Sequence, residues 1–271
     1  MRLEPQVTVI VSADGRPAGL EATLRSLAAG PGPALQALVL AWTPQDAAAA
    51  MALGAAVLEL PAGLGPSAAR NQVVGVVETP WLAFLQAGLC LDEGWGATAL
   101  AGLADGRPVA AVGGRLMDEH GRLQHAGYQG ISLKAGERPL ELRYAGQEAQ
   151  GPSLRPRRYQ SLSEHCLVMG RGDFLAVGGF SPALSPPYSG HDLCFKLRFQ
   201  LGKALAYQPG LVGRWAAGFG PPAEPEIRMV EHKIFYERWR ERLFPDFAIW
   251  DAVDASEART GRVIPDYETL L

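Results

Sequence analysis

Two adjacent pairs of ionisable residues carry most of the chemistry that this sequence could perform. Glu164-His165 comes directly before an apolar, strand-like run, and His191-Asp192 comes directly before a segment with helix-like spacing of apolar residues. Carboxylate and imidazole groups at the ends of strands and helices are the usual acids, bases and ligands of sheet-based enzymes. The stretch from Glu164 to Arg198 is therefore the first candidate for a functional site.

Each of these residues also has a purely structural interpretation. Asp192 could cap the N-terminus of a helix that starts at Leu193, which is a common position for Asp. His191 could be a solvent-facing loop residue. Glu164 lies beside a buried run and would need a partner there, such as a salt bridge or a hydrogen bond. The sequence leaves these alternatives open.

The elements that must position these residues alternate between strands and helices. The run of β-branched residues from Val7 to Val11 is typical of a strand buried on both faces of a parallel sheet. Apolar spacing and Pro/Gly breaks predict, in order, helix 20–27, strand 35–40, helix 44–53, strand 56–60, helix 68–77, strand 81–85, helix 95–103 and strand 109–112. This order predicts right-handed crossovers and a doubly wound α/β sheet.

The second half of the chain is less regular. We expect a hairpin tip at residues 118–121, a mobile loop over 136–156 and one more strand at 204–208. A helix is expected over residues 226–243, with an aromatic stripe that includes Phe235 and Trp239, followed by a polar tail from Asp251 that drapes over the surface. We therefore expect one domain over residues 1–220 and a helical extension and tail over 221–271, whose stripe leaves docking or a homodimer open.

Composition excludes several classes of protein. The net charge of −3 argues against a nucleic-acid surface, and 48% hydrophobic residues favour a sizeable core. The three cysteines lie far apart among apolar residues, which fits buried thiols in a reducing compartment. No signal peptide and no apolar run of membrane-spanning length is predicted. We therefore expect a cytoplasmic protein.

The order of motifs resembles that of family 2 glycosyltransferases, which have the GT-A fold. The matching segments are VTVIVSADGRP from Val7, SAARN (67–71), WLAFLQAG (81–88), VGGRLMDEHGRLQHAG (112–127), GRGDFLAVGGF (170–180) and HDLCFKLRFQLGKALAYQP (191–209). The resemblance implies a mixed, mostly parallel sheet with helices on both faces. It also implies inverting transfer of a hexose-type sugar from a nucleotide-sugar donor to a carbohydrate or lipid-linked acceptor.

The resemblance also assigns expected roles to individual positions. Donor-binding residues would be Ala13, Asp14, Trp42, Arg70, Gln86 and Gly88. Acceptor-side residues would be His165, Gly179 and Ser189. For the base that takes the acceptor hydroxyl proton, the order of preference is Asp192, then His191, then Glu164. Arg70, Lys203 and Arg214 are candidates for neutralising the leaving diphosphate.

The sequence departs from the family at three functional places. The acidic cluster that would hold Mg²⁺ or Mn²⁺ is replaced by Gln86-Ala87-Gly88, so no metal ligands are expected unless a local shift brings in Asp92 and Glu93. Ala41-Trp42-Thr43 replaces an Asp after the second strand. The Glu-Asp pair that precedes a further Asp reads Ser189-Gly190, followed by His191 and Asp192.

Two functions follow from the match and from the departures. The first is a glycosyltransferase that works without the usual metal site. The second is a catalytically inactive relative that binds a nucleotide, a glycan or another protein.

Overall fold

The computed structural model describes residues 6–27, 32–104, 107–131, 139–220 and 229–266. The first half of the chain follows the expected alternation of strands and helices. Its elements are β1 (Val7–Ser12), α1 (Pro17–Leu27), β2 (Leu35–Ala41), α2 (Pro44–Ala52), β3 (Ala56–Glu59), α3 (Pro66–Val74), β4 (Trp81–Gln86), β5 (Leu89–Leu91) and α4 (Trp95–Leu103).

In the described residues, the second half continues the main sheet and adds four α-helices, one 3₁₀ helix and a separate two-stranded sheet of β8 and β9. Its elements are β6 (Val109–Met117), β7 (Leu123–His125), β8 (Tyr128–Gly130), β9 (Leu140–Leu142), the 3₁₀ helix η1 (Gly151–Leu154), β10 (Arg157–Arg158), β11 (Cys166–Gly170), α5 (Arg171–Ala176), α6 (Tyr188–Leu201), β12 (Ala204–Trp215), α7 (Met229–Trp239) and α8 (Phe247–Thr260). In the described part of the chain, no helix is long and apolar enough to cross a bilayer.

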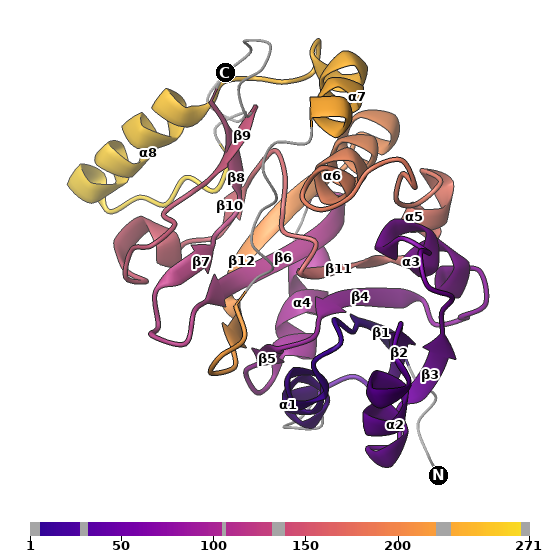
Figure 1. Ribbon diagram of the computed structural model, residues 1–271. Coiled ribbons are helices and arrows are strands. Elements are labelled where there is room, and N and C mark those ends of the chain that lie inside the picture. The colour runs from indigo at the N-terminus through magenta and orange to yellow at the C-terminus, as the bar shows by residue number, and fades with distance from the viewer. Residues whose placement is uncertain (1–5, 28–31, 105–106, 132–138, 221–228, 267–271) are drawn as a thin grey trace.

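A ten-stranded mixed sheet forms the centre of the molecule, with the strand order β10-β12-β6-β11-β4-β1-β2-β3 (Figure 1). β1 is parallel to β2 and β4, and β12 is parallel to β6. β11 runs antiparallel to β4, with Cys166 opposite Leu85. The start of β11 therefore lies at the edge where β1, β2 and β4 end, which we call the carboxyl edge of the sheet. The predicted α/β class is confirmed.

Alternate residues of each central strand pack on opposite faces of the sheet, as the pleat requires. Val9 and Val11 of β1 belong to a core shared with Leu20 of α1 and Trp95 of α4. Ile10, between them, belongs to a core on the other face with residues of α3, α5 and α6. Helices thus cover both faces of the sheet (Figure 1).

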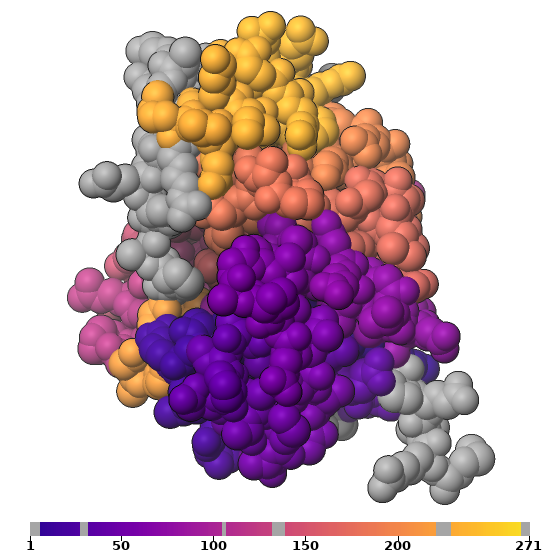
Figure 2. All heavy atoms as spheres, turned by 45° about the vertical axis from the view of Figure 1, so that its right-hand side comes forward, coloured from indigo at the N-terminus to yellow at the C-terminus, as the bar shows by residue number. Residues whose placement is uncertain are grey.

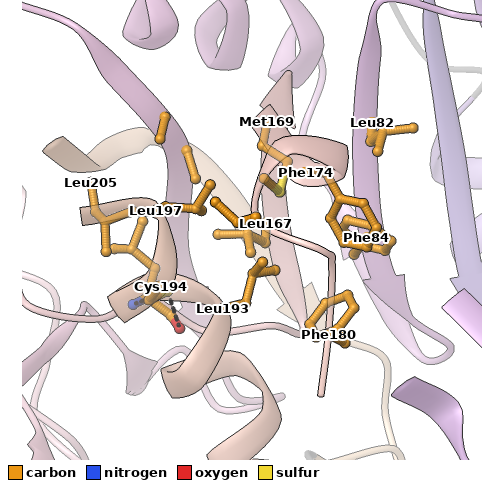
Figure 3. Close-up of a cluster of buried hydrophobic side chains, with 14 of the residues drawn as sticks. Leu82, Phe84, Leu167, Met169, Phe174, Phe180, Leu193, Cys194, Leu197 and Leu205 are labelled. Carbon is orange, nitrogen blue, oxygen red and sulfur yellow. Dashed lines mark hydrogen bonds between the residues drawn. The ribbon is translucent and has the colours of Figure 1, made fainter. Parts of the chain in front are cut away.

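Three phenylalanines fix the strand-loop-helix unit that follows β11 (Figure 3). Phe84 of β4 packs against Phe174 of α5 and Phe180, with ring centroids 5.3 and 5.1 Å away. The chain turns between them at Gly179, where φ is +64° and an added Cβ would lie 2.5 Å from the Asn71 Oδ1 atom. The glycine break seen in the sequence therefore allows a close approach of this loop to α3.

The expected mobile loop over residues 136–156 is wrong for the part that is described, residues 139–156. β9 pairs with β8, and η1 follows it. The buried Arg143 donates to Gln129 Oε1 at 2.7 Å and pairs with Asp254 of α8 at 2.5 Å. These polar contacts hold the segment in a defined structure, which its weak apolar periodicity did not predict.

Residues 251–260 of the polar tail expected from Asp251 are instead part of the helix α8, and residues 267–271 of that tail lie outside the described residues. Trp250 is fully buried and packs on Tyr159, with ring centroids 5.2 Å apart. One fully buried Trp gives the helix an apolar anchor, although most of its residues are polar. This is a correction to the sequence reading, which lacked a periodic apolar stripe here.

The aromatic stripe expected to be available for a partner is buried within the chain. Phe235 and Trp239 of α7 pack on Phe195 of α6, with ring centroids 5.4 and 5.6 Å away. In Figure 2 the gold C-terminal residues lie directly on the salmon surface of the residues before them. The stripe therefore gives no support to a homodimer.

Candidate active site

Three segments meet at the carboxyl edge of the sheet. β1 ends at Ser12, β4 ends at Gln86, and His165 directly precedes β11. The Gln86 N–H donates to the His165 carbonyl oxygen at 3.2 Å, and Gln86 Nε2 donates to the Ser12 carbonyl oxygen at 3.2 Å. Ligand sites in open α/β sheets lie outside such an edge.

A buried ionic network joins this edge to the helices α3 and α6. Arg70 of α3 pairs with the Glu164 carboxylate through Nη1 and donates from Nε to Ser12 Oγ at 3.2 Å. The Ser189 hydroxyl and the Gly190 N–H of α6 donate to Glu164 Oε1 at 2.8 and 3.0 Å. Arg70 and Glu164 are 1% and 3% exposed. The partner that a buried Glu164 was expected to need is therefore Arg70.

The Glu164 carboxylate lies in the space that a side chain at position 190 would need. A Cβ atom added to Gly190 would lie 3.0 Å from Glu164 Oε1. By the resemblance, Gly190 stands where the family has the Asp of its Glu-Asp pair. A carboxylate is thus present at that place, although it comes from the segment before β11 instead of from α6.

Asp192 does not cap a helix, so that structural interpretation is wrong. α6 begins at Tyr188, which places Asp192 in the second turn. Its fully buried carboxylate accepts hydrogen bonds from Arg238 at 2.6 Å and Trp239 at 2.9 Å, and it pairs with Lys196 at 3.0 Å. These contacts fasten α7 to α6, and they use the carboxylate that the sequence ranked first as the base.

His191 is buried in α6, so its interpretation as a solvent-facing loop residue is wrong as well. Its Nδ1 atom is hydrogen-bonded to the Ser161 hydroxyl at 2.8 Å. Its ring stands edge-on to Tyr128, with centroids 4.4 Å apart. The imidazole therefore packs between α6, β8 and the segment before β11.

Two further histidines near this edge are held in the neutral form. Burial, with Arg70 nearby, lowers the pKa of His165 to about 4. Burial also lowers the pKa of His125 well below its usual value. His165 Nδ1 and His125 Nε2 are enclosed without a hydrogen-bond partner among the described residues. His125 is 40 positions from His165 in the sequence, and only the fold shows that it shares this region with His165.

Three of the positions expected to bind the donor, Ala13, Asp14 and Trp42, directly follow β1 and β2. The Ala13 N–H donates to the Leu40 carbonyl oxygen at 3.1 Å, and the exposed Asp14 pairs with Arg16. The Trp42 indole N–H donates to the Leu64 carbonyl oxygen at 2.8 Å, which holds the ring half-buried beside this edge. These three residues therefore follow strands that end next to the Glu164 network.

Sequence reasoning missed Asp46, which connects two of the segments beside this edge. Asp46 is fully buried in the first turn of α2, and its Oδ2 atom accepts from the Gly15 N–H at 3.0 Å and from the Thr43 hydroxyl at 2.9 Å. It therefore ties the loop after β1 to the start of α2. The Thr43-Pro44-Gln45-Asp46 run is an ordinary helix start, so its link to the first loop has no signal in the sequence.

The residues at the expected metal position do not fit a divalent cation. Gln86-Ala87-Gly88 offers no carboxylate. The Phe219 side chain fills the space beside Gly88, since a Cβ atom added to Gly88 would lie 2.9 Å from the Phe219 Cβ atom. Asp92 pairs with Arg214 at 3.3 Å, and Glu93 is exposed. Among the described residues, no three His, Cys, Asp or Glu side chains are grouped so that they could hold a metal ion. Phe219 was also missed by sequence reasoning, because it is distant from Gly88 in the chain.

The remaining residues that the sequence proposed for the site, Gly179, Arg214 and Lys203, lie in different places. Gly179 lies beside α3, and its carbonyl oxygen accepts from Lys196 Nζ at 2.9 Å. Arg214 lies near the end of β12, at the carboxyl edge. Lys203 lies at the opposite end, directly before β12, and pairs with Asp173 at 2.7 Å. The structure therefore removes Lys203 from the candidate site.

Comparison with solved structures supports the GT-A fold. The chain is similar to a structure described as GalNAc-T7 with UDP, GalNAc and Mn²⁺, with a TM-score of 0.63, 15% sequence identity and coverage of 88% of this chain. The matched part spans 49% of that protein, about half its length. No protein-family model matches the chain. No curated protein matches it either.

Proposed function

We propose that this protein is a glycosyltransferase that binds a nucleotide-sugar at the carboxyl edge and transfers the sugar with inversion, using Glu164 as the base. The GT-A fold and the glycosyltransferase likeness support the reaction class. The observation that carries the proposal is the Glu164 carboxylate beside Gly190. It supplies the acidic group that the sequence lacks at position 190.

The contacts of the three candidate bases favour Glu164 over the other two. Asp192 is enclosed by Arg238, Trp239 and Lys196, between α6 and α7. His191 is enclosed by Ser161 and the surrounding rings. Glu164 is held partly by a hydroxyl, that of Ser189, which an acceptor hydroxyl could replace without loss of hydrogen bonding.

In the proposed reaction, Glu164 takes the proton of the acceptor hydroxyl while the acceptor oxygen bonds to the anomeric carbon of the sugar. The bond from that carbon to the nucleoside diphosphate breaks at the same time, and the diphosphate leaves with the electron pair. Arg70 is buried against Glu164, whereas Arg16, which lies directly before α1 and pairs with Asp14, is exposed, so Arg16 is the better candidate to face the diphosphate.

A first experiment tests donor binding. UDP is the first probe, because the similar solved structure holds UDP, and a panel of nucleotide sugars follows. A donor that binds only the folded state stabilises it by RT ln(1 + [L]/Kd), so the melting temperature rises with donor concentration. If no nucleotide and no nucleotide sugar shifts the melting temperature, the proposal is wrong.

A second experiment separates binding from transfer. Glu164→Gln is expected to keep the donor-induced shift in melting temperature, measured where the variant is folded, and to lose at least about 100-fold in transfer rate. Ser189→Ala is the matched variant, because it removes a hydrogen bond to the same carboxylate and leaves the carboxylate in place. It is expected to retain transfer. An equal loss in both variants would refute Glu164 as the base.

The second candidate function is a donor-binding protein that does not transfer sugar. It is favoured by Glu164 being 3% exposed and already hydrogen-bonded by Ser189, Gly190 and Arg70. Donor-induced stabilisation without transfer or donor hydrolysis, across carbohydrate and lipid-linked acceptors, would establish this function instead.

A further inference from the structure

An aromatic ring occupies part of the candidate active site. Phe219, in the segment that follows β12, is half-buried, and its side chain lies against Gly19 in the first turn of α1 and against Gly88. A Cβ atom added to Gly19 would lie 2.6 Å from two carbon atoms of the ring, and one added to Gly88 would lie 2.9 Å from the Phe219 Cβ atom. The absence of side chains at these two glycines therefore leaves the space that the ring fills.

Gly19 is an unfavourable residue for its place in a helix. It is the third residue of α1, and glycine inside a helix destabilises it relative to alanine. Its φ angle does not lie in the left-handed region, so the backbone does not require a glycine there. The close approach of the Phe219 ring is the feature that does require one.

The same ring covers the cation that is proposed to face the diphosphate. The guanidinium carbon of Arg16 lies 4.8 Å from the centroid of the Phe219 ring, which is a cation–π contact. Arg16 directly precedes α1, so the ring, the guanidinium and the first turn of this helix lie together. A diphosphate held by Arg16 and by the N-terminus of α1 would need the space that the ring occupies.

A tight turn at the sheet edge carries the ring. The Phe219 N–H donates to the Ala216 carbonyl oxygen at 2.8 Å, and Gly218 between them has a φ of +76°, which glycine adopts readily. The Ala216 N–H donates to the Gly88 carbonyl oxygen at 2.8 Å. The Gly218 N–H donates to Glu119 Oε2 at 2.8 Å, and the Glu119 side chain is 42% exposed. Movement of the turn would break this exposed hydrogen bond and leave β12 in place.

We infer that Phe219 is an autoinhibitory residue, whose ring occupies the diphosphate position in the free protein and is displaced when a donor binds. This inference rests on the proposed donor site. A diphosphate is the stronger partner for Arg16, because paired opposite charges attract more strongly than a cation and a ring. The ring still lowers the apparent affinity, because only the fraction of molecules with the ring displaced can bind the donor.

Calorimetric titration of the full chain with UDP tests the inference. F219A is expected to bind UDP at least about 5-fold more tightly than the unchanged protein, because the competing ring is gone. The matched control F247A removes the same ring from an exposed position on α8 and should bind UDP as the unchanged protein does. A gain of affinity also separates this role from a structural one, since damage to the fold would weaken binding.

A second variant tests the turn without changing the ring. Glu119→Ala removes the acceptor of the Gly218 N–H and is expected to tighten UDP binding by about 2-fold or more, because the ring is displaced more often. Glu78→Ala is its control, because it removes the same charge from an exposed residue before β4, at the other end of the sheet. It should leave UDP binding unchanged. This pair of variants also tests the inference if F219A does not fold.

A crystal structure with UDP shows where the ring goes. We expect the Phe219 ring to lie away from Gly19 and the diphosphate to contact Arg16. The inference is overturned, and the proposed donor site stands, if UDP binds F219A no more tightly than the unchanged protein or if the ring stays against Gly19 with UDP bound. If neither UDP nor any nucleotide sugar binds the unchanged protein or F219A, the proposed function is wrong and the inference falls with it.

Discussion

At the scale of single residues, the charged side chains of the Glu164 network are stabilised by an opposite charge and by hydrogen bonds. Glu164 and Arg70 lie 94 positions apart in the sequence, and they neutralise each other at the carboxyl edge. A buried charge is tolerable when its partner and its hydrogen bonds are complete, and it becomes costly when one member is removed. The same network that presents a carboxylate beside Gly190 therefore also stabilises the fold.

Glu164→Gln is expected to lower the free energy of unfolding by about 3–5 kcal/mol, because it leaves the buried Arg70 without its counter-charge. The matched control is Glu21→Gln, which breaks the exposed pair with Arg25 on α1 and should cost at most about 0.5 kcal/mol. Urea unfolding followed by circular dichroism measures both. A similarly small cost in both variants would contradict the conclusion that the buried Arg70 depends on Glu164 as its counter-charge.

Stability is expected to fall as the pH is lowered from about 6.5 towards 4. Burial lowers the pKa of His165 to about 4, so the folded state stays neutral while the unfolded state, with a usual value near 6.5, takes up a proton. The contribution is fully present above the unfolded pKa and is lost at about 1.4 kcal/mol per pH unit as the pH falls to the folded pKa.

The variant His165→Asn should therefore show a weaker dependence of the unfolding free energy on pH between 6.5 and 4. His120→Asn is its control, because the His120 side chain is 75% exposed and should leave the slope unchanged. Urea unfolding at a series of pH values measures both slopes. A slope in His165→Asn equal to that of the unchanged protein would mean that His165 titrates normally in the folded state.

At the scale of elements, the two C-terminal helices are attached in different ways. α7 packs through the rings of Phe235 and Trp239 on α6. α8 is attached by the buried Trp250 and by ion pairs that link Glu257 to Arg155 and Arg157. Arg157 belongs to β10, which is an edge strand of the sheet. These ion pairs therefore attach α8 to that edge.

Trp250→Ala is expected to lower the free energy of unfolding by about 3–5 kcal/mol, because it leaves a cavity against Tyr159 and Arg157. Phe247→Ala, on the same helix, is the control. Phe247 is 43% exposed, and the loss of its ring should cost under about 1.5 kcal/mol. Thermal and urea unfolding compare the two. Equal costs would contradict the anchoring of α8 by Trp250.

At the scale of the whole molecule, the sheet has two chemically different ends. The carboxyl edge carries the neutral histidines and the compensated Glu164 network, with Phe219 over Gly88. At the opposite end, a cavity is lined by Arg107, Arg158 and Arg198, among other residues. An anionic donor at the first end would have to be held by few exposed cations, such as Arg16.

Binding of UDP is therefore expected to be independent of Mn²⁺. The melting temperature with UDP should rise equally with Mn²⁺ and with a chelator, because Gln86, Ala87 and Gly88 offer no carboxylate. A shift seen only with Mn²⁺ would show that Asp92 or Glu93 leaves its present position to bind the ion.

The sequence by itself determined the alternation of strands and helices in the first half of the chain and the α/β class, because apolar periodicity and Pro/Gly breaks are local signals. It also located the segments around Glu164 and Asp192, and the absence of carboxylates at residues 86–88. Only the tertiary structure decided what the charged residues do. Long-range packing joined Glu164 to Arg70 and Asp192 to Arg238, and it placed Phe219 over Gly88. No local pattern encodes such contacts, since they depend on which side chains the completed fold brings together.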